Sequence, residues 1–170
     1  MEHFIDLVKE ANRYFETADH LAYVTFPVVN DKKILMLIVE HVHKALVKGV
    51  EAFLYYDSLY KRISNMPSNL NNQISLFKNY TLRRYNLSSE MVLLIKEVDD
   101  LIKHRETSPV EFTRRESYII SSNNYRLKSV SIEKVKKFVT LTKDLLGKLN
   151  EVLERENDRR FSWYCKGRAQ

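Results

Sequence analysis

The residues with the clearest chemical potential lie in one stretch, residues 108–130, and its flanks, where basic and aromatic side chains alternate. An arginine can bind a phosphate through two N–H groups at once, and both arginine and an aromatic ring can stack on an unpaired base. We therefore predict that this region binds RNA, with a preference for single strands. The predicted binding residues are Arg105, Arg114, Arg115, Tyr118, Tyr125, Arg126, Lys128, Lys134, Lys136 and Lys137. The alternative is that the apolar and aromatic residues of the stretch cap a core while its arginines are solvated.

The positive charge of the chain is concentrated in the same region and at the C-terminal end. The net charge is +6. Residues 103–137 carry nine Lys or Arg and four Glu, a balance of +5, and residues 155–170 have a balance of +3. The rest of the chain is therefore slightly acidic. Such a local concentration is expected of a surface that meets phosphates or another acidic partner.

Arg13 and His20 are a second candidate for chemistry, because residues seven positions apart share one face of a helix. Six residues separate the two. This spacing resembles the arginine–histidine motif of the HEPN superfamily of small helical ribonucleases. The resemblance implies that Arg13 polarises a phosphate while His20 moves the proton of an attacking 2′-hydroxyl. The chain departs from the family in one respect, because the pair lies inside the first expected helix and the family places its motif near the start of a late one.

Other chemistry has little support in the sequence. Residues 40–43 contain one Glu-x-x-His motif, whereas a di-iron site in a helical bundle needs two. The single cysteine, Cys165, lies far from any histidine in the sequence, and no phosphate-cradling glycine loop or G-x-S-x-G motif is present. We therefore expect no metal and no cofactor.

The composition favours one domain made of long helices. A chain of 170 residues with only three glycines and three prolines has few places for tight turns. One cysteine excludes an intramolecular disulfide, which suggests a reducing, cytoplasmic location. The most apolar run, residues 34–39, is too short to cross a membrane, so no membrane partner is expected.

Apolar residues recur every three or four positions in five segments, which predicts five helices. The expected helices cover residues 4–25, 31–63, 70–84, 89–104 and 131–156. Pro27 should end the first and Ser131 should cap the last. Packing of their apolar stripes gives an all-α fold, a four- to five-helix bundle over residues 1–156.

Two segments fall outside this helical pattern. The basic insert, residues 108–130, is non-helical, and its residues 116–120 and 125–130 suit a two-stranded β-ribbon joined by the turn 121–124. Residues 157–170 lose the helical period, so we expect a basic, aromatic C-terminal tail.

Two long stretches carry a broader resemblance. ADHLAYVTFPVVNDKKILMLIVEHVHKALVKGVEAFLYYDSLYKRI covers residues 18–63, and KHRETSPVEFTRRESYIISSNNYRLKSVSIEKVKKF covers residues 103–138. Both are similar to a family of small archaeal helical proteins that has no assigned activity. The resemblance implies a shared fold and no mechanism. The helix order is also similar to that of HEPN-type bundles, which is an analogy of fold alone.

These observations support three hypotheses of different classes. The first is a non-catalytic module that binds RNA or a ribonucleoprotein surface through the basic aromatic insert. The second is a protein-interaction or homo-oligomeric bundle, in which the insert or the tail residues Phe161, Trp163 and Tyr164 dock on a partner chain. The third is a HEPN-like ribonuclease using Arg13 and His20. The charge distribution favours the first, because a dimer interface alone gives no reason to collect the net charge in two segments.

Overall fold

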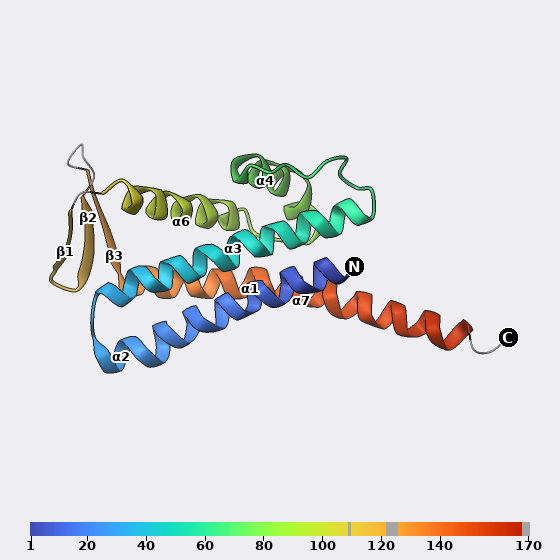
Figure 1. Ribbon diagram of the computed structural model, residues 1–170, viewed down its shortest axis with the longest axis horizontal. Coiled ribbons are helices and arrows are strands. Elements are labelled where there is room, and N and C mark those ends of the chain that lie inside the picture. The colour runs from blue at the N-terminus through green and yellow to red at the C-terminus, as the bar shows by residue number, and fades with distance from the viewer. Residues whose placement is uncertain (109, 122–125, 168–170) are drawn as a thin grey trace.

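Three long helices, α1, α3 and α7, run along the length of the molecule, and a small sheet closes one end (Figure 1). This computed structural model describes the backbone of residues 1–108, 110–121 and 126–167 and the side chains of that set up to residue 158. The elements are α1 (Glu2–His20), η1 (Leu21–Thr25), α2 (Phe26–Val29), α3 (Lys33–Leu59), α4 (Leu70–Leu76), η2 (Phe77–Thr81), α5 (Leu82–Arg84), α6 (Glu90–Glu106), β1 (Val110–Arg114), β2 (Ser117–Ser121), β3 (Leu127–Ser131) and α7 (Ile132–Gly167). The expected fold, mostly helical with a β insert before the last helix, is confirmed.

The first helix continues past Pro27, where the sequence suggested that it would end. The helical path runs from α1 through η1, which has π-helical geometry, into α2. The wider turn of a π-helix relieves the clash between a proline ring and the carbonyl four residues earlier, so Pro27 is accommodated. The path ends at Asn30, which adopts a left-handed conformation with φ of 52°. Asparagine tolerates this conformation better than most residues.

The central helix is α3, which packs against α1, α6 and α7. It is shorter than the segment expected from the sequence, but its apolar residues are buried on several sides because neighbours surround it. Gly49 lies at its closest approach to α7. A Cβ atom at this position would come within 2.9 Å of Leu145 Cδ2 and 3.3 Å of Leu146 Cδ2. The missing side chain therefore lets the two helices pack closely.

The third expected helix, residues 70–84, is present but is divided into α4, η2 and α5. The Asn69 side chain accepts a hydrogen bond from the backbone N–H of Asn71 at 2.8 Å, which caps α4. Ile74 and Phe77 are buried. At the start of α6, Ser88 Oγ accepts a hydrogen bond from the Glu90 N–H at 3.2 Å.

The basic insert folds as a three-stranded antiparallel sheet in the order β1-β2-β3. The pairing of β2 with β3 confirms the expected ribbon, while most of its expected turn lies outside the described residues. The strand β1 was not expected, and it pairs with β2 from Val110, opposite Ser121, to Arg114, opposite Ser117. Ser131 ends β3 and its Oγ accepts from the Lys134 N–H at 3.4 Å, so it caps α7 as expected.

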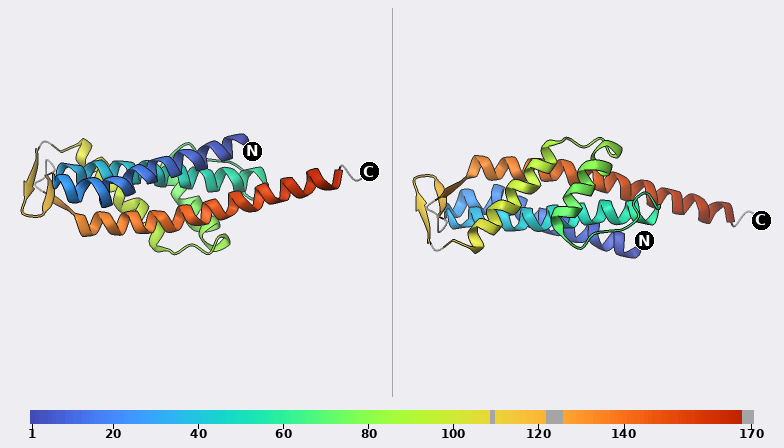
Figure 2. Two further views of the ribbon diagram at one scale, coloured as in Figure 1. Left: turned by 90° about the horizontal axis from the view of Figure 1, so that it is seen from below. Right: turned by 90° about the horizontal axis from the view of Figure 1, so that it is seen from above.

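The last helix is longer than the sequence suggested, because α7 continues to Gly167. Its C-terminal part extends beyond the other helices in both views of Figure 2. Glu156 is the last of its described side chains to be buried. The apolar period is lost there because α7 leaves its packing partners, and residues 157–166 contain no glycine or proline that would end the helix. The division between a domain ending at residue 156 and a tail stays a prediction.

The packing at Gly49 can be tested with a pair of alanine variants. Alanine stabilises an exposed helix position by about 0.5–1 kcal/mol relative to glycine, so Gly147→Ala should raise the free energy of unfolding by that amount. Apart from its chain neighbours and the nearby backbone of α7, no described atom lies within 4 Å of the new Cβ at this position. Gly49→Ala should lower the free energy of unfolding, because overpacking costs about 1–3 kcal/mol. Urea denaturation measures both. Equal stabilisation by the two substitutions would contradict the close α3–α7 contact.

Candidate functional site

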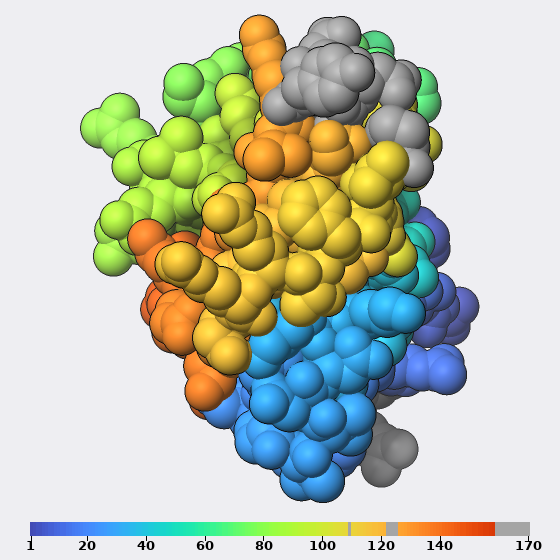
Figure 3. Space-filling model, turned by 90° about the vertical axis from the view of Figure 1, so that its left-hand side faces the viewer, coloured from blue at the N-terminus to red at the C-terminus, as the bar shows by residue number. Residues whose placement is uncertain are grey.

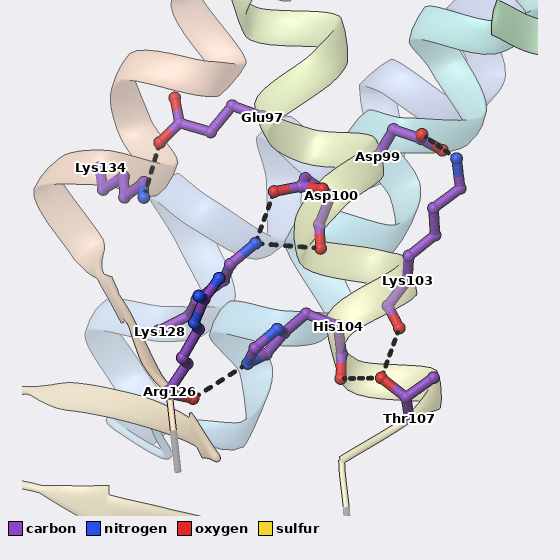
Figure 4. Close-up of polar contacts among 9 residues, drawn as sticks. All are labelled: Glu97, Asp99, Asp100, Lys103, His104, Thr107, Arg126, Lys128 and Lys134. Atoms are coloured by element: carbon purple, nitrogen blue, oxygen red, sulfur yellow. Dashed lines mark hydrogen bonds and ion pairs between the residues drawn. The ribbon is translucent and has the colours of Figure 1, made fainter. Parts of the chain in front are cut away.

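Two of the cations predicted to bind RNA are held by carboxylates on α6 (Figure 4). Lys128 Nζ lies 2.7 Å from Asp100 Oδ2 and 3.3 Å from the Asp100 carbonyl oxygen. Lys134 Nζ lies 2.7 Å from Glu97 Oε1. The hydrogen bond from Lys128 is the main reason that the pKa of Asp100 is held below its ordinary value. These pairs place acidic groups beside two of the expected phosphate ligands.

The same face of α6 fixes the start of β3. The His104 imidazole donates through Nε2 to the carbonyl oxygen of Arg126, with a separation of 3.3 Å (Figure 4). Lys103, the residue before His104, pairs with Asp99 one turn earlier on α6, with Nζ 2.5 Å from Oδ2. The Arg126 side chain is exposed at this junction. Tyr125, also predicted to bind RNA, lies outside the described residues.

Arg105 and Tyr118 belong to a network that attaches the sheet to the bundle. The Arg105 guanidinium forms ion pairs with Glu40 of α3 and with Glu111 of β1, the latter with Nε 3.0 Å from Oε1. The Tyr118 hydroxyl donates to the second oxygen of Glu111. Tyr118 is only 5% exposed, and burial together with this hydrogen bond raises its pKa to about 12. Its ring is therefore covered by protein, and the prediction that it stacks on RNA is not supported by this position.

The other predicted cations lie near the β1–β2 turn and at the start of α7. Arg114, Arg115 and Lys137 are exposed, and within the described part of the chain their side chains make no ion pair or hydrogen bond. Lys136 Nζ lies over the ring of Tyr23, 5.4 Å from its centroid. The basic surface available to a ligand is therefore smaller than the sequence suggested.

The outward face of the sheet adds residues that sequence reasoning did not select. Directly paired residues in an antiparallel sheet point to the same side, and the buried residues Tyr118, Ile120 and Val130 identify the inward side. The described residues of the outward side are Val110, Phe112, Arg114, Ser117, Ile119, Ser121, Leu127, Ser129 and Ser131. This described set contains no carboxylate.

Exposed apolar side chains are prominent on that face. Phe112 is 40% exposed and Leu127 is 58% exposed, while Ile119 between their strands is nearly buried. Figure 3 views this end of the molecule, with the yellow residues of β1 and β2 across the middle and the blue residues around α2 below them. The alternation of residues 110–114 could have revealed the strand from sequence, because Val110 and Phe112 alternate with polar residues.

Behind the sheet, a cleft of about 440 Å³ lies between α3 and α6. Its lining residues are Glu40, His43, Lys44, Ile102, Arg105, Glu106 and Glu111. His43 Nε2 lies 3.2 Å from Asp99 Oδ1, so a carboxylate orients the imidazole, an arrangement that can transfer protons. Arg105 and Glu40 at its wall are already engaged in holding the sheet. Within the described residues, no group of three or more His, Cys, Asp or Glu is arranged to hold a metal ion.

The structure does not join Arg13 to His20. Both side chains are exposed on α1, and His20 Nδ1 lies 3.4 Å from Thr25 Oγ1. No contact between the side chains of Arg13 and His20 is found in the described part of the molecule. The side chains of Phe161, Trp163, Tyr164 and Cys165 lie outside the described set.

Comparison of the chain with protein-family models, with curated proteins and with solved structures finds no match. The similarity to archaeal helical proteins and to HEPN-type bundles therefore stays an expectation from the sequence. Among the described residues, no helix combines the length and the apolar character needed to traverse a bilayer.

The attachment of the sheet through Arg105 can be tested by stability. Arg105→Gln removes both ion pairs, and because these side chains are about one-third exposed, we expect the free energy of unfolding to fall by about 1–2 kcal/mol. Hydrogen exchange of the β1 and β2 amides should accelerate most. Lys128→Gln removes an ion pair with the more exposed Asp100 and should cost under about 1 kcal/mol. Unchanged exchange in the sheet of the Arg105 variant would contradict this role.

His41, a half-buried residue of α3 whose ring lies 6.2 Å from that of Tyr14 on α1, provides a pH-dependent test of the structure. Its Nδ1 is buried and has no hydrogen-bond partner among the described residues. Burial, followed by repulsion from Lys44, lowers its pKa below the ordinary value of 6.5. The unfolded chain therefore binds more protons below about pH 6.5, so stability should fall as the pH decreases through that value. Urea denaturation between pH 7.5 and pH 5 should show that the free energy of unfolding falls more steeply with decreasing pH in the native chain than in His41→Leu. Identical slopes would contradict the lowered pKa.

Proposed function

We propose that the protein is a non-catalytic module that binds single-stranded RNA with the sheet end of the bundle. The proposal depends mainly on one observation, the exposed ring of Phe112 beside Arg114 on a sheet face without a carboxylate among its described residues. The two residues are two positions apart on one strand, about 7 Å. A base stacked on Phe112 would therefore bring an adjacent phosphate within reach of the arginine.

The residues around this pair extend the surface in a way that suits a flexible polyanion. Arg115 follows Arg114 in the turn, and Lys136 and Lys137 lie in the first turns of α7. Their side chains can supply phosphate contacts, which give affinity without sequence preference. The serines of the outward face add hydroxyl groups that can donate to phosphate or 2′-hydroxyl oxygens.

Fluorescence anisotropy with a labelled mixed-sequence single-stranded RNA tests the proposal. We expect Arg114→Glu combined with Arg115→Glu to weaken binding at least tenfold, because two phosphate contacts become repulsive. Phe112→Ala should weaken it about 5- to 150-fold, the range for loss of one stacked base. Affinity of the native chain should decrease steeply between 50 and 200 mM salt.

A matched control uses two cations away from the sheet. Lys78 on η2 and Lys143 on α7 are exposed, and Lys78→Glu with Lys143→Glu changes the net charge by the same amount as the arginine pair. This control variant should retain most of the native chain's affinity for RNA. Equal weakening by both double variants would mean that only net charge matters, and would contradict a site on the sheet. Absence of cleavage products in the same incubations separates binding from the ribonuclease hypothesis of Arg13 and His20.

A second candidate function is docking of a protein partner on the same end. The observation that favours it is the number of exposed apolar side chains there. Val28 and Val29 of α2 are exposed, and Figure 3 shows the blue segment around α2 next to the yellow strands. Aromatic residues and arginine are also common anchors of protein interfaces. A defined oligomer in sedimentation velocity that Phe112→Ala dissociates, together with no RNA binding, would favour this function over the first.

A further inference from the structure

We propose that the end of the bundle opposite the sheet has a second binding site, which holds the phosphate of a small phosphomonoester between two arginines. This inference is independent of the proposed RNA-binding function. The site is a pocket of about 330 Å³, a size typical of small-molecule sites. Its lining residues are Tyr56, Arg62, Arg84, Tyr85, Val152 and Arg155.

The pocket is formed by segments that are distant in the sequence. Tyr56 is near the C-terminal end of α3 and Arg62 follows that helix, Arg84 ends α5, and Arg155 is on α7. Figure 1 shows this end of α3 on the far side of the molecule from the sheet. Because α3 has 27 residues at about 1.5 Å each, roughly 40 Å separates the pocket from the proposed RNA surface.

The centre of the site is Asp57, a fully buried carboxylate with 0% exposure. Its Oδ1 lies 2.9 Å from Arg84 Nη1 and 3.2 Å from Arg62 Nη1. The Tyr85 hydroxyl donates to the same oxygen at 2.9 Å, and Thr81 Oγ1 donates to Oδ2 at 3.4 Å. One arginine would be enough to neutralise one carboxylate. The cluster of Arg62, Arg84 and Asp57 therefore carries one net positive charge.

Both guanidinium groups keep donors for a further partner. An arginine has five N–H donors, and among the described residues Arg62 and Arg84 use only Nη1. Their side chains are about one-third exposed. Arg62 also stacks on Tyr60, with 4.8 Å from its central carbon to the ring centroid. Two fixed guanidinium planes can each present a pair of N–H groups, the geometry that phosphate oxygens accept.

The carboxylates near the pocket have partners of their own. Asp57 already accepts hydrogen bonds on both oxygens, and Glu156, which is 4% exposed, accepts from the Tyr56 hydroxyl at 2.7 Å. Glu151 Oε2 lies 3.7 Å from Arg155 Nη2, but both side chains of this pair are well exposed, so the ion pair is weak. Burial and the neighbouring carboxylates raise the pKa of Tyr56 and of Tyr85, so both phenols stay protonated and donate to those carboxylates.

The shape of the pocket indicates the rest of the ligand. The hydroxyls of Tyr56 and Tyr85 point to the buried carboxylates. Tyr85 is half-buried and lines the pocket, whereas Tyr56 is only 5% exposed and its ring packs against Phe4 and Tyr60. One aromatic wall next to an oxyanion site suits a phosphate attached to a flat or apolar group. A mononucleotide combines both features, and inorganic phosphate has only the first.

Isothermal titration of the full chain with inorganic phosphate, adenosine 5′-monophosphate and adenosine tests the inference. We expect both phosphate-bearing probes to bind and adenosine alone to bind at least tenfold more weakly than the nucleotide. Arg84→Lys keeps the charge but loses the paired donors, and should weaken phosphate binding at least tenfold. The neighbouring Arg83→Lys is the matched control, because Arg83 is exposed and does not line this pocket, and it should bind as the native chain does.

Nitrogen-15 NMR of the arginine side chains gives a readout that does not depend on a variant that folds. Addition of phosphate should shift the Nε–H signals of Arg62 and Arg84 and leave that of Arg83 in place. Tighter binding of the nucleotide than of phosphate would assign its base to the Tyr85 ring, and equal affinities would assign the site to phosphate alone. The inference would be overturned if millimolar phosphate did not shift the Nε–H signals of Arg62 and Arg84. Equal loss of phosphate affinity in Arg83→Lys and Arg84→Lys would also overturn it. The variant Arg114→Glu with Arg115→Glu should leave this binding unchanged, which separates it from the RNA proposal.

Discussion

The structure of the sheet end depends on the ion pairs of Arg105. This residue of α6 bridges Glu40 on α3 and Glu111 on β1, and Glu111 in turn accepts from Tyr118 on β2. Three strands of five residues are marginal without such support. At the β1–β2 turn, Lys32 Nζ lies 2.5 Å from Glu116 Oε2. The sheet is thus fixed across the end of the bundle, and its outward face can act as a rigid surface.

The same ion pairs limit what that surface can bind. A cation that neutralises a carboxylate of the bundle contributes little net attraction to a phosphate. The positive charge of residues 103–137 is therefore divided into two sets, one that attaches the sheet to α6 and one, including Arg114 and Arg115, that faces solvent. Only the second set, with Phe112, supports an RNA-binding role.

The two proposed sites lie at opposite ends of α3 and suit ligands of different size and flexibility. At the sheet, exposed groups on a flat face suit a long, flexible ligand with many weak contacts. At the other end, the buried charge of Asp57 fixes Arg62 and Arg84 in advance, and such preorganisation suits a small ligand. Neither site requires the other, because a continuous helix and an apolar core separate them.

The sequence by itself determined the elements, since helix and strand periods are local properties. It predicted the five helical segments, the β2–β3 ribbon and the Ser131 cap, and it missed the π-helical turns, the strand β1 and the length of α7. Only the tertiary structure decided which charges are available. Arg105 meets Glu40 65 positions away, and Asp57 gathers partners up to 28 positions away, so no local pattern contains these pairs. The alternation of side chains along each strand defines two faces of the sheet. Only packing against the bundle decided which face is inward, so that Tyr118 is buried and Phe112 is exposed.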